Sequence, residues 1–310
     1  MSTQLKPVVV PYDKYTLFPF RLVEEVVAVL RKRGATFESF ADRGMQLADC
    51  RSRMASVREY GRYKTGTASL PLAAVATVLN RVARRSIRLA GCARWLGWRR
   101  PRIPSVVLHH DADRQPHKTV DMMQLEARLG VVSSSYFFVK RCARWAGDEE
   151  PYEVDFATLR ALEERGFEIG YHLNAMERAG YDPARAEVVA AADIALLRQK
   201  INLRSFVPHG GVPGPGGVNN EHTPYTGELA SLLWVYSGRG FVNDFLWSDG
   251  YAEGEPALKL RDPRTVASAL RGRMRGHFLM HPQYYGHTLR PDWETLPISR
   301  LPWWRALWHL

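Results

Sequence analysis

Residues 105–139, "SVVLHHDADRQPHKTVDMMQLEARLGVVSSSYFFV", contain two apolar runs separated by a segment with helical spacing. The runs at 105–110 and 131–139 predict strands, and residues 117–130 predict a helix that ends at a glycine. A strand, a helix and a second strand in this order pair the two strands in parallel. This stretch therefore predicts an α/β fold.

The same order repeats along the rest of the chain. Helices are predicted at 155–166 and 183–200, and strands at 167–172, 203–209 and 276–281. Asp155 is placed to cap the first of these helices and Gly166 to end it. Residues 8–40 read as strand, loop, helix, turn and short strand. Alternation of this kind indicates a parallel sheet in an α/β layer or barrel.

Polar side chains gather where these strands end. His110, His172, His209 and His281 each fall at the carboxyl end of a predicted strand, and the chain has only 10 histidines. In parallel α/β folds the active site forms at that edge. We therefore expect these imidazoles to lie near Asp111 and Asp113, which follow the first strand.

Imidazoles and carboxylates are ligands of zinc-type ions, which commonly take three ligands from the protein and leave one position for water. A further carboxylate can accept a proton from that water, and an imidazole can protonate a leaving group. The three cysteines, Cys50, Cys92 and Cys142, are scattered and predict neither a disulfide framework nor a thiolate metal site. Aspartates that only cap the helix at 117–129 are the alternative, although a cap needs one side chain.

Several segments together resemble a known family. "VVLHHDADRQPHKTVDMMQLEARLGVVSSSYFFV", "GFEIGYH", "FVPHGG" and "LMHPQYY" occur in the order found in the polysaccharide deacetylases, the NodB-homology carbohydrate esterases. The first motif resembles a divergent branch that reads His-Asp-x-Asp-Arg. The resemblance covers about residues 105–285. It implies a distorted (β/α)7-type barrel and metal-dependent removal of an N-acetyl group from an amino sugar.

The resemblance also implies roles for individual residues. Asp111 is similar to the catalytic base of the family, and Asp113 is similar to its metal-binding aspartate. His172 resembles the first metal-binding histidine, and His281 resembles the late histidine that acts as general acid. The implied cofactor is a divalent metal ion, with Zn²⁺ expected.

The sequence departs from the family at two positions. The usual second metal-binding histidine falls on Met176, whose thioether is a poor zinc ligand. The usual arginine that braces the base falls on Val207. We expect His209 to supply the third ligand and Arg114 to brace Asp111. His110 and Asn174 complete the predicted site, as residues that support the ligands or contact the substrate.

The charge of the chain, +11 in total, is concentrated at one end. Ten basic residues and no acidic one lie between Glu59 and Asp111, and residues 72–98 have the spacing of an amphipathic helix. An ordinary surface helix explains this pattern as well as an interfacial helix bound to anionic lipid does. The tail 301–310, "LPWWRALWHL", adds tryptophans that favour a membrane interface. No nucleic-acid-binding motif accompanies the charge.

We expect three parts of the chain. Residues 1–104 form an N-terminal strand–helix unit with the basic segment, residues 105–290 form the deacetylase-like barrel, and residues 291–310 form a Trp-rich tail. The start of the chain lacks the pattern of a secretory signal. The expected location is therefore cytoplasmic, at the inner face of a membrane if the basic segment binds lipid.

The function predicted from the sequence is N-deacetylation of a cell-surface glycan or of its lipid-linked precursor. A carbohydrate- or lipid-binding protein on a catalytically decayed deacetylase scaffold is the alternative from another class, because Met176 and Val207 depart from the family. An O-acetyl esterase on the same fold is a third interpretation. Metal content and the effect of changing His172 discriminate the enzyme from the binding protein.

Overall fold

The structure is a computed structural model. The residues it describes are 18–43, 104–142, 152–210, 214–235, 245–249, 263–270 and 275–287. The predicted basic segment 72–98, the tail 301–310 and the first predicted strand near residue 8 lie outside the described residues. Within the described part of the chain, no helix is long and apolar enough to cross a membrane.

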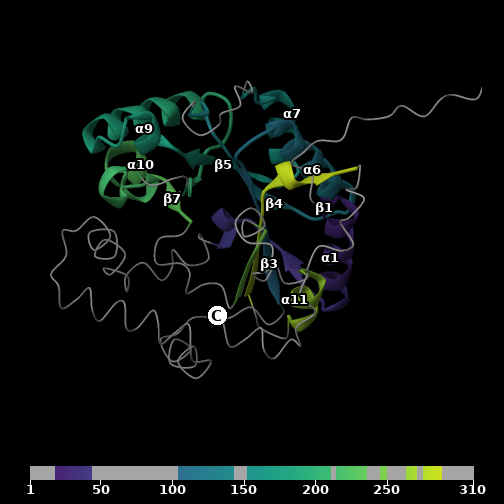
Figure 1. Cartoon of the computed structure of the whole chain (residues 1–310). Helices are drawn as coiled ribbons and strands as arrows, with labels where there is room; N and C mark the ends of the chain where they lie inside the picture. The colour runs from purple at the N-terminus through teal and green to yellow at the C-terminus, as the bar shows by residue number, and fades with distance from the viewer. Residues whose placement is uncertain are drawn as a thin grey trace, which may run out of the picture.

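The centre of the molecule is a parallel sheet of eight strands that curls into a half-barrel (Figure 1). Seven strands follow the order β7-β6-β5-β4-β3-β9-β8, and β2 pairs with the first residues of β3. Every pairing in the sheet is parallel, as the strand–helix alternation predicts. The strands are β2 (Thr36–Phe37), β3 (Ser105–Ala112), β4 (Ser133–Phe137), β5 (Glu168–Leu173), β6 (Ser205–Pro208), β7 (Leu233–Trp234), β8 (Phe245–Ser248) and β9 (Arg275–Met280).

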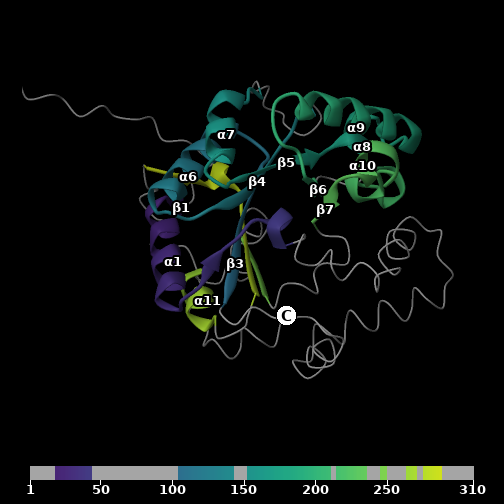
Figure 2. The ribbon, with the colours of Figure 1, turned by 180° about the vertical axis from the view of Figure 1, so that it is seen from behind.

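Helices cover the outer face of this sheet (Figures 1 and 2). One apolar core joins β4, β5 and β6 to the helices on their side, and a second joins β3, β8 and β9 to α1 and α11. A two-stranded pairing of β1 (Phe18–Pro19) with β10 (Tyr285–Gly286) lies beside the second core. The helices are α1 (Arg21–Lys32), α6 (Pro116–Arg128), α7 (Phe156–Glu163), α8 (Ala175–Arg178), α9 (Pro183–Arg198), α10 (Gly227–Ala230) and α11 (Pro263–Ala269).

Local signals in the sequence set the ends of the long helices. Oδ1 of Asp155 accepts hydrogen bonds from the backbone N–H groups of Ala157 and Thr158, both at 3.1 Å, so the predicted cap of α7 is confirmed. Asp182 caps α9 in the same way. Gly166, after α7, adopts a φ of +95°, which glycine tolerates best. These caps fix where each helix returns the chain to the sheet.

The inner face of the half-barrel is largely polar. Its apolar part is a small cluster of Phe40, Val107, Tyr136, Val207 and Val235. Tyr136 fits there because β5 has Gly170 opposite it: a Cβ at that position would lie 2.2 Å from Cε1 of Tyr136. Side chains alternate along a strand, so the polar residues that share this face point into the half-barrel.

The structure confirms the predicted α/β class and barrel-like sheet. The predicted strand at 105–110 extends to Ala112, because β3 pairs with β4 through that residue, and Asp111 therefore belongs to the strand. The short helix α8, the strand β8 and the helix α11 were not predicted. The strand–helix unit expected within 8–40 joins the same sheet through β2.

Candidate metal centre and active site

The predicted site residues meet at the carboxyl edge of the sheet. Asp113 directly follows β3, whereas His172 lies near the end of β5. His209 directly follows β6, and His281 directly follows β9. Since β6, β5, β4, β3 and β9 are neighbours in this order, the fold brings their ends side by side.

Asp113, His172 and His209 could hold a metal ion. Each offers one ligand atom, and the three atoms lie within 4.8 Å of one another. Nε2 of His172 is 2.9 Å from Oδ1 of Asp113, and Nε2 of His209 is 3.8 Å from that oxygen. Zinc bonds of about 2.0–2.2 Å at tetrahedral angles separate ligand atoms by roughly 3.4 Å, so the donor set fits such an ion.

Hydrogen bonds at Nδ1 orient the rings of His172 and His209. Nδ1 of His172 donates to the carbonyl oxygen of Val207 at 3.1 Å, and Nδ1 of His209 lies 3.1 Å from Oε1 of Glu177. With a proton on Nδ1, each ring can offer the lone pair of Nε2 to a metal ion. This arrangement of outer hydrogen bonds is the usual one for histidines that bind metals.

The short helix α8 places Glu177 against His209. Asn220 links the two segments: its Oδ1 accepts from the backbone N–H of Met176, and its Nδ2 donates to the carbonyl oxygen of His209, both at 3.1 Å. Met176 itself is fully buried in the outer apolar core. The position where the resembled family has its second metal-binding histidine therefore serves packing in this chain.

An aromatic wall closes one side of the three ligands. The ring of Phe138 stacks on His172 at 4.6 Å between centroids and meets the edge of His209 at 5.1 Å. The hydroxyl of Tyr152 accepts from the backbone N–H of Phe138 and donates to the carbonyl oxygen of Ala112 at 2.7 Å. Apolar surroundings of this kind strengthen electrostatic interactions at the site.

Asp111 has a histidine as its hydrogen-bond partner. Oδ1 of Asp111 accepts from Nε2 of His109 at 2.7 Å. Burial raises the pKa of Asp111, but the interactions with His109 and His172 outweigh burial and hold the pKa below its ordinary range. Asp111 is therefore a carboxylate at neutral pH. Arg114, predicted to brace it, lies half-buried just beyond the end of β3.

Asp113 is also ionised. Burial again raises its pKa, yet the hydrogen bond from His172 and the charges of His281 and His209 lower the pKa to about 2. Burial opposes the protonation of His172, whereas Asp111 and Asp113 favour it and raise the pKa of that imidazole. In the absence of a metal, protons on His172 and His281 thus compensate the two carboxylates.

His281 is held by a buried carboxylate that follows β8. Nδ1 of His281 lies 2.6 Å from Oδ1 of Asp249, and its backbone N–H donates to Oδ2 at 2.8 Å. Nε2 of His281 lies 3.7 Å from Oδ2 of Asp113, on the side of the metal ligands. Burial lowers the pKa of His281, but Asp249, Asp113 and Asp111 together raise it to about 10. This imidazole carries a proton at neutral pH.

The remaining predicted residues lie around the site. His110 points to the other face of the sheet, where its Nε2 lies 2.9 Å from Oε1 of the fully buried Glu126 on α6. Asn174, before α8, donates from Nδ2 to the carbonyl oxygen of Lys140 at 2.8 Å. His110 therefore joins the sheet to a helix, and Asn174 joins two loops at the carboxyl edge.

Sequence reasoning missed three residues at the site, Asp249, His109 and His277, and left Glu177 unplaced. Asp249 follows the apolar run "FLWS" (245–248), which is the same position after a strand that singled out the other residues. His109 is two residues from Asp111, so strand alternation places both on one face. No pattern in the sequence links Glu177 to His209, because their contact depends on how α8 packs.

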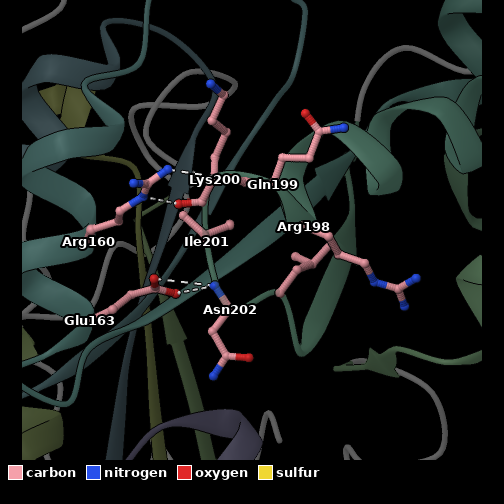
Figure 3. Close-up of a pocket in the computed structure, with 8 residues that line it drawn as sticks. Arg160, Glu163, Arg198, Gln199, Lys200, Ile201 and Asn202 are labelled. Carbon is pink, nitrogen blue, oxygen red and sulfur yellow. Dashed lines mark hydrogen bonds between the residues drawn. The ribbon is translucent and has the colours of Figure 1, made fainter.

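A surface pocket lies at the opposite, amino edge of the sheet (Figure 3). Its polar groups satisfy one another: Arg160 donates from Nε to the carbonyl oxygen of Lys200 at 2.6 Å, and Glu163 accepts from the backbone N–H of Asn202 at 3.1 Å. Arg198, also in its lining, pairs with Glu228 of α10. We assign this pocket no role.

No protein-family model matches the chain, and no curated protein matches it. Two solved structures are similar to it. A CE4 family pseudoenzyme from Bacillus anthracis is 13% identical over 67% of this chain and 64% of that chain, with a TM-score of 0.28. A mutant of that pseudoenzyme with restored enzymatic activity is 14% identical over 67% and 66%, with a TM-score of 0.27. The match thus spans less than two thirds of the first protein. TM-scores this low do not establish which residues of the two proteins correspond. The site is therefore described from the geometry of this chain alone.

Proposed function

We propose that the protein is a metal-dependent amide hydrolase that removes an N-acetyl group from an amino sugar. The observation that carries the proposal is the placement of a buried Asp-His-His set beside a separate carboxylate and a separate protonated imidazole. The set is Asp113, His172 and His209, and the separate groups are Asp111 and His281. Metal-assisted hydrolysis of an amide uses these functions together.

Zn²⁺ is the ion we propose, because two imidazoles and one carboxylate with an open fourth position form a catalytic zinc site. A divalent ion bound there would polarise the amide carbonyl and lower the pKa of a water molecule towards about 7. Asp111, an ionised carboxylate next to the set, accepts the proton of the attacking water. His281, kept protonated by Asp249, donates a proton to the departing amine.

The proposed substrate is a cell-surface glycan or its lipid-linked precursor, in keeping with the resemblance in the sequence. The proposed place of action is the cytoplasmic face of a membrane, reached through residues 72–98 and 301–310, with no role for nucleic acid. Removal of residues 301–310, followed by a measurement of binding to anionic vesicles, tests whether the tail contributes to membrane binding. Unchanged binding would exclude that contribution.

The experiment measures zinc content and acetate release from an N-acetylglucosamine pentamer. We expect the wild-type protein to bind zinc and release acetate, and Asp113→Asn and His209→Ala to lose the metal. Asp111→Asn should keep the metal and lose turnover. His117→Ala is the matched control, because His117 is exposed near the start of α6 and is not one of the proposed ligands.

Two outcomes contradict the proposal in different ways. Full turnover of Asp111→Asn would show that another group is the base. Zinc binding without acetate release from the pentamer or from an O-acetylated sugar favours a carbohydrate-binding protein on a decayed scaffold. The position of Met176 in the apolar core favours that second function only if His209 fails to bind the ion.

A further inference from the structure

Two imidazoles lie on the inner face of the sheet directly behind Asp111. His109 precedes Asp111 by two residues on β3, and His277 lies on the neighbouring strand β9. Their rings stack with 5.1 Å between centroids and an interplanar angle of 18°. His109 is 0% exposed and His277 is 2% exposed. Neither ring is among the metal ligands or the acid and base described above.

The three side chains form a hydrogen-bonded chain. Nε2 of His277 lies 2.9 Å from Nδ1 of His109, and Nε2 of His109 lies 2.7 Å from Oδ1 of Asp111. An ionised carboxylate can only accept, so Nε2 of His109 is the donor. Nδ1 of a neutral His109 must then accept, and Nε2 of His277 is the donor to it. One tautomer of each ring satisfies the whole chain.

The surroundings of the two rings keep them neutral. Burial lowers the pKa of His277 well below its ordinary value, and the neighbouring His109 and Arg43 lower it further. Burial also lowers the pKa of His109, against the opposite influence of Asp111. A neutral His109 donates one hydrogen bond and accepts another, and a neutral His277 still has a proton to donate, as the hydrogen-bonded chain requires.

Aromatic rings fix the orientation of both imidazoles. Phe40 meets His109 and His277 edge-on, at interplanar angles of 89° and 88°. Tyr136 also meets His109 edge-on, at an interplanar angle of 76°, and its hydroxyl lies 3.0 Å from Oγ of Ser205. Rotation of either imidazole would require these packed rings to move, so the donor on His109 keeps its direction.

We propose that His109, held by His277, is the positioning residue that orients the carboxylate of Asp111 for catalysis. The proposal rests on the proposed function of Asp111 as the base. It assigns to a buried pair of histidines the bracing that the sequence alone led us to expect from Arg114. A carboxylate fixed at one oxygen presents the other in a constant direction, which is what proton transfer in a reaction requires.

The test compares replacements at both positions in the zinc-loaded protein. His109→Leu and His277→Leu break the hydrogen-bonded series from His277 to Asp111. His109→Gln and His277→Gln keep an amide that can donate a hydrogen bond. We expect the leucine variants to lower kcat for acetate release from the N-acetylglucosamine pentamer by about 10- to 100-fold, as outer partners of active-site groups do. KM should stay within about twofold. Glutamine should recover part of kcat.

Two further measurements separate positioning from general damage. Zinc affinity should be unchanged in all four variants, because Asp113, His172 and His209 are untouched. Nitrogen-15 spectra of the histidine rings, recorded without substrate, should show hydrogen-bonded protons on Nε2 of both His109 and His277. They should also show that His277→Leu shifts the His109 signals.

The outcomes distinguish this proposal from the proposed function. Unchanged kcat in both leucine variants, a protonated Nδ1 on His109, or equal loss of zinc affinity and kcat would each overturn the positioning role. If the wild-type protein releases no acetate, the proposed function fails and the nitrogen spectra alone decide. Hydrogen-bonded protons on Nε2 of both rings then support the hydrogen-bonded series from His277 to Asp111, and the absence of these protons overturns it.

Discussion

Nε2 of His172 lies 2.9 Å from Oδ1 of Asp113, although 59 residues separate them in the chain. The contact crosses from the end of β5 to the end of β3, with β4 between them in the sheet. It is close enough for both atoms to bind one ion of about 2 Å bond length. This contact anchors the candidate metal centre, and the predictions below concern the groups around it.

We predict that Glu177→Gln lowers zinc affinity by about 10- to 100-fold, because the carboxylate that orients His209 loses its charge. Isothermal titration with Zn²⁺ measures the change. Glu164→Gln is the matched control, since Glu164 is exposed after α7. Equal affinities for the two variants would show that His209 needs no carboxylate behind it, or that it is not a ligand.

Zinc affinity should rise with pH from about pH 6 to pH 8. The folded protein holds the pKa of His172 above its ordinary value of 6.5, so at pH 6 a metal ion must displace a proton from this ring. Proton release on binding, measured by titration in two buffers of different ionisation enthalpy, should accompany the effect. Affinity that does not change with pH would contradict a protonated His172 in the metal-free protein.

Asp249→Asn should lower the pKa of His281. In the folded protein Asp249, with Asp113 and Asp111, raises that pKa to about 10. The pair therefore stabilises the metal-free protein fully below about pH 6.5, and this contribution is lost as pH rises through 10. NMR titration of the metal-free protein measures the pKa directly. In the loaded enzyme, the alkaline limb of the pH–rate profile should move to lower pH.

The matched variant is Asp249→Glu, which keeps the negative charge. It should retain a raised pKa for His281, though with altered geometry. If Asp249→Asn leaves both the NMR titration and the alkaline limb unchanged, His281 owes its proton to other groups and the role of Asp249 is wrong.

Gly170→Ala should destabilise the fold by roughly 1–3 kcal/mol, the usual cost of overpacking a core. The added Cβ would lie 2.2 Å from Cε1 of Tyr136 and 3.1 Å from the carbonyl oxygen of Ser205. Urea unfolding of the metal-free protein measures the effect. Gly210→Ala is the control, because no heavy atom lies within 4 Å of a Cβ there. Equal stability of the two variants would show that Tyr136 can leave the inner face.

Much of the architecture could be predicted because short-range patterns encode it. The apolar runs, the capping residue Asp155 and Gly166 after α7 specify strands, helices and their ends. Strand–helix alternation then requires parallel pairing, and parallel pairing places Asp113, His172, His209 and His281 at one edge. The short elements α8 and β8 were not predicted, because tertiary packing rather than a local sequence pattern stabilises them.

The partners of the site residues could not be predicted in the same way. The sequence led us to expect a brace for Asp111 from Arg114, and no pattern pointed to the hydrogen bond from His109, which in turn contacts His277 168 residues away. Asp249 and Glu177 likewise reach His281 and His209 through neighbouring strands and a packed helix. Such contacts depend on which strands become neighbours and on how side chains fill the half-barrel.

The sequence by itself determined the α/β class, the order of the main strands and helices, and the residue types available for metal chemistry. It could do so because hydrophobic spacing, caps and glycines act over a few residues. Only the tertiary structure decided that three particular side chains can share an ion, and that histidine and carboxylate partners orient the site. Those relations depend on distances between distant segments, which the curl of the sheet and the packing of its inner face define.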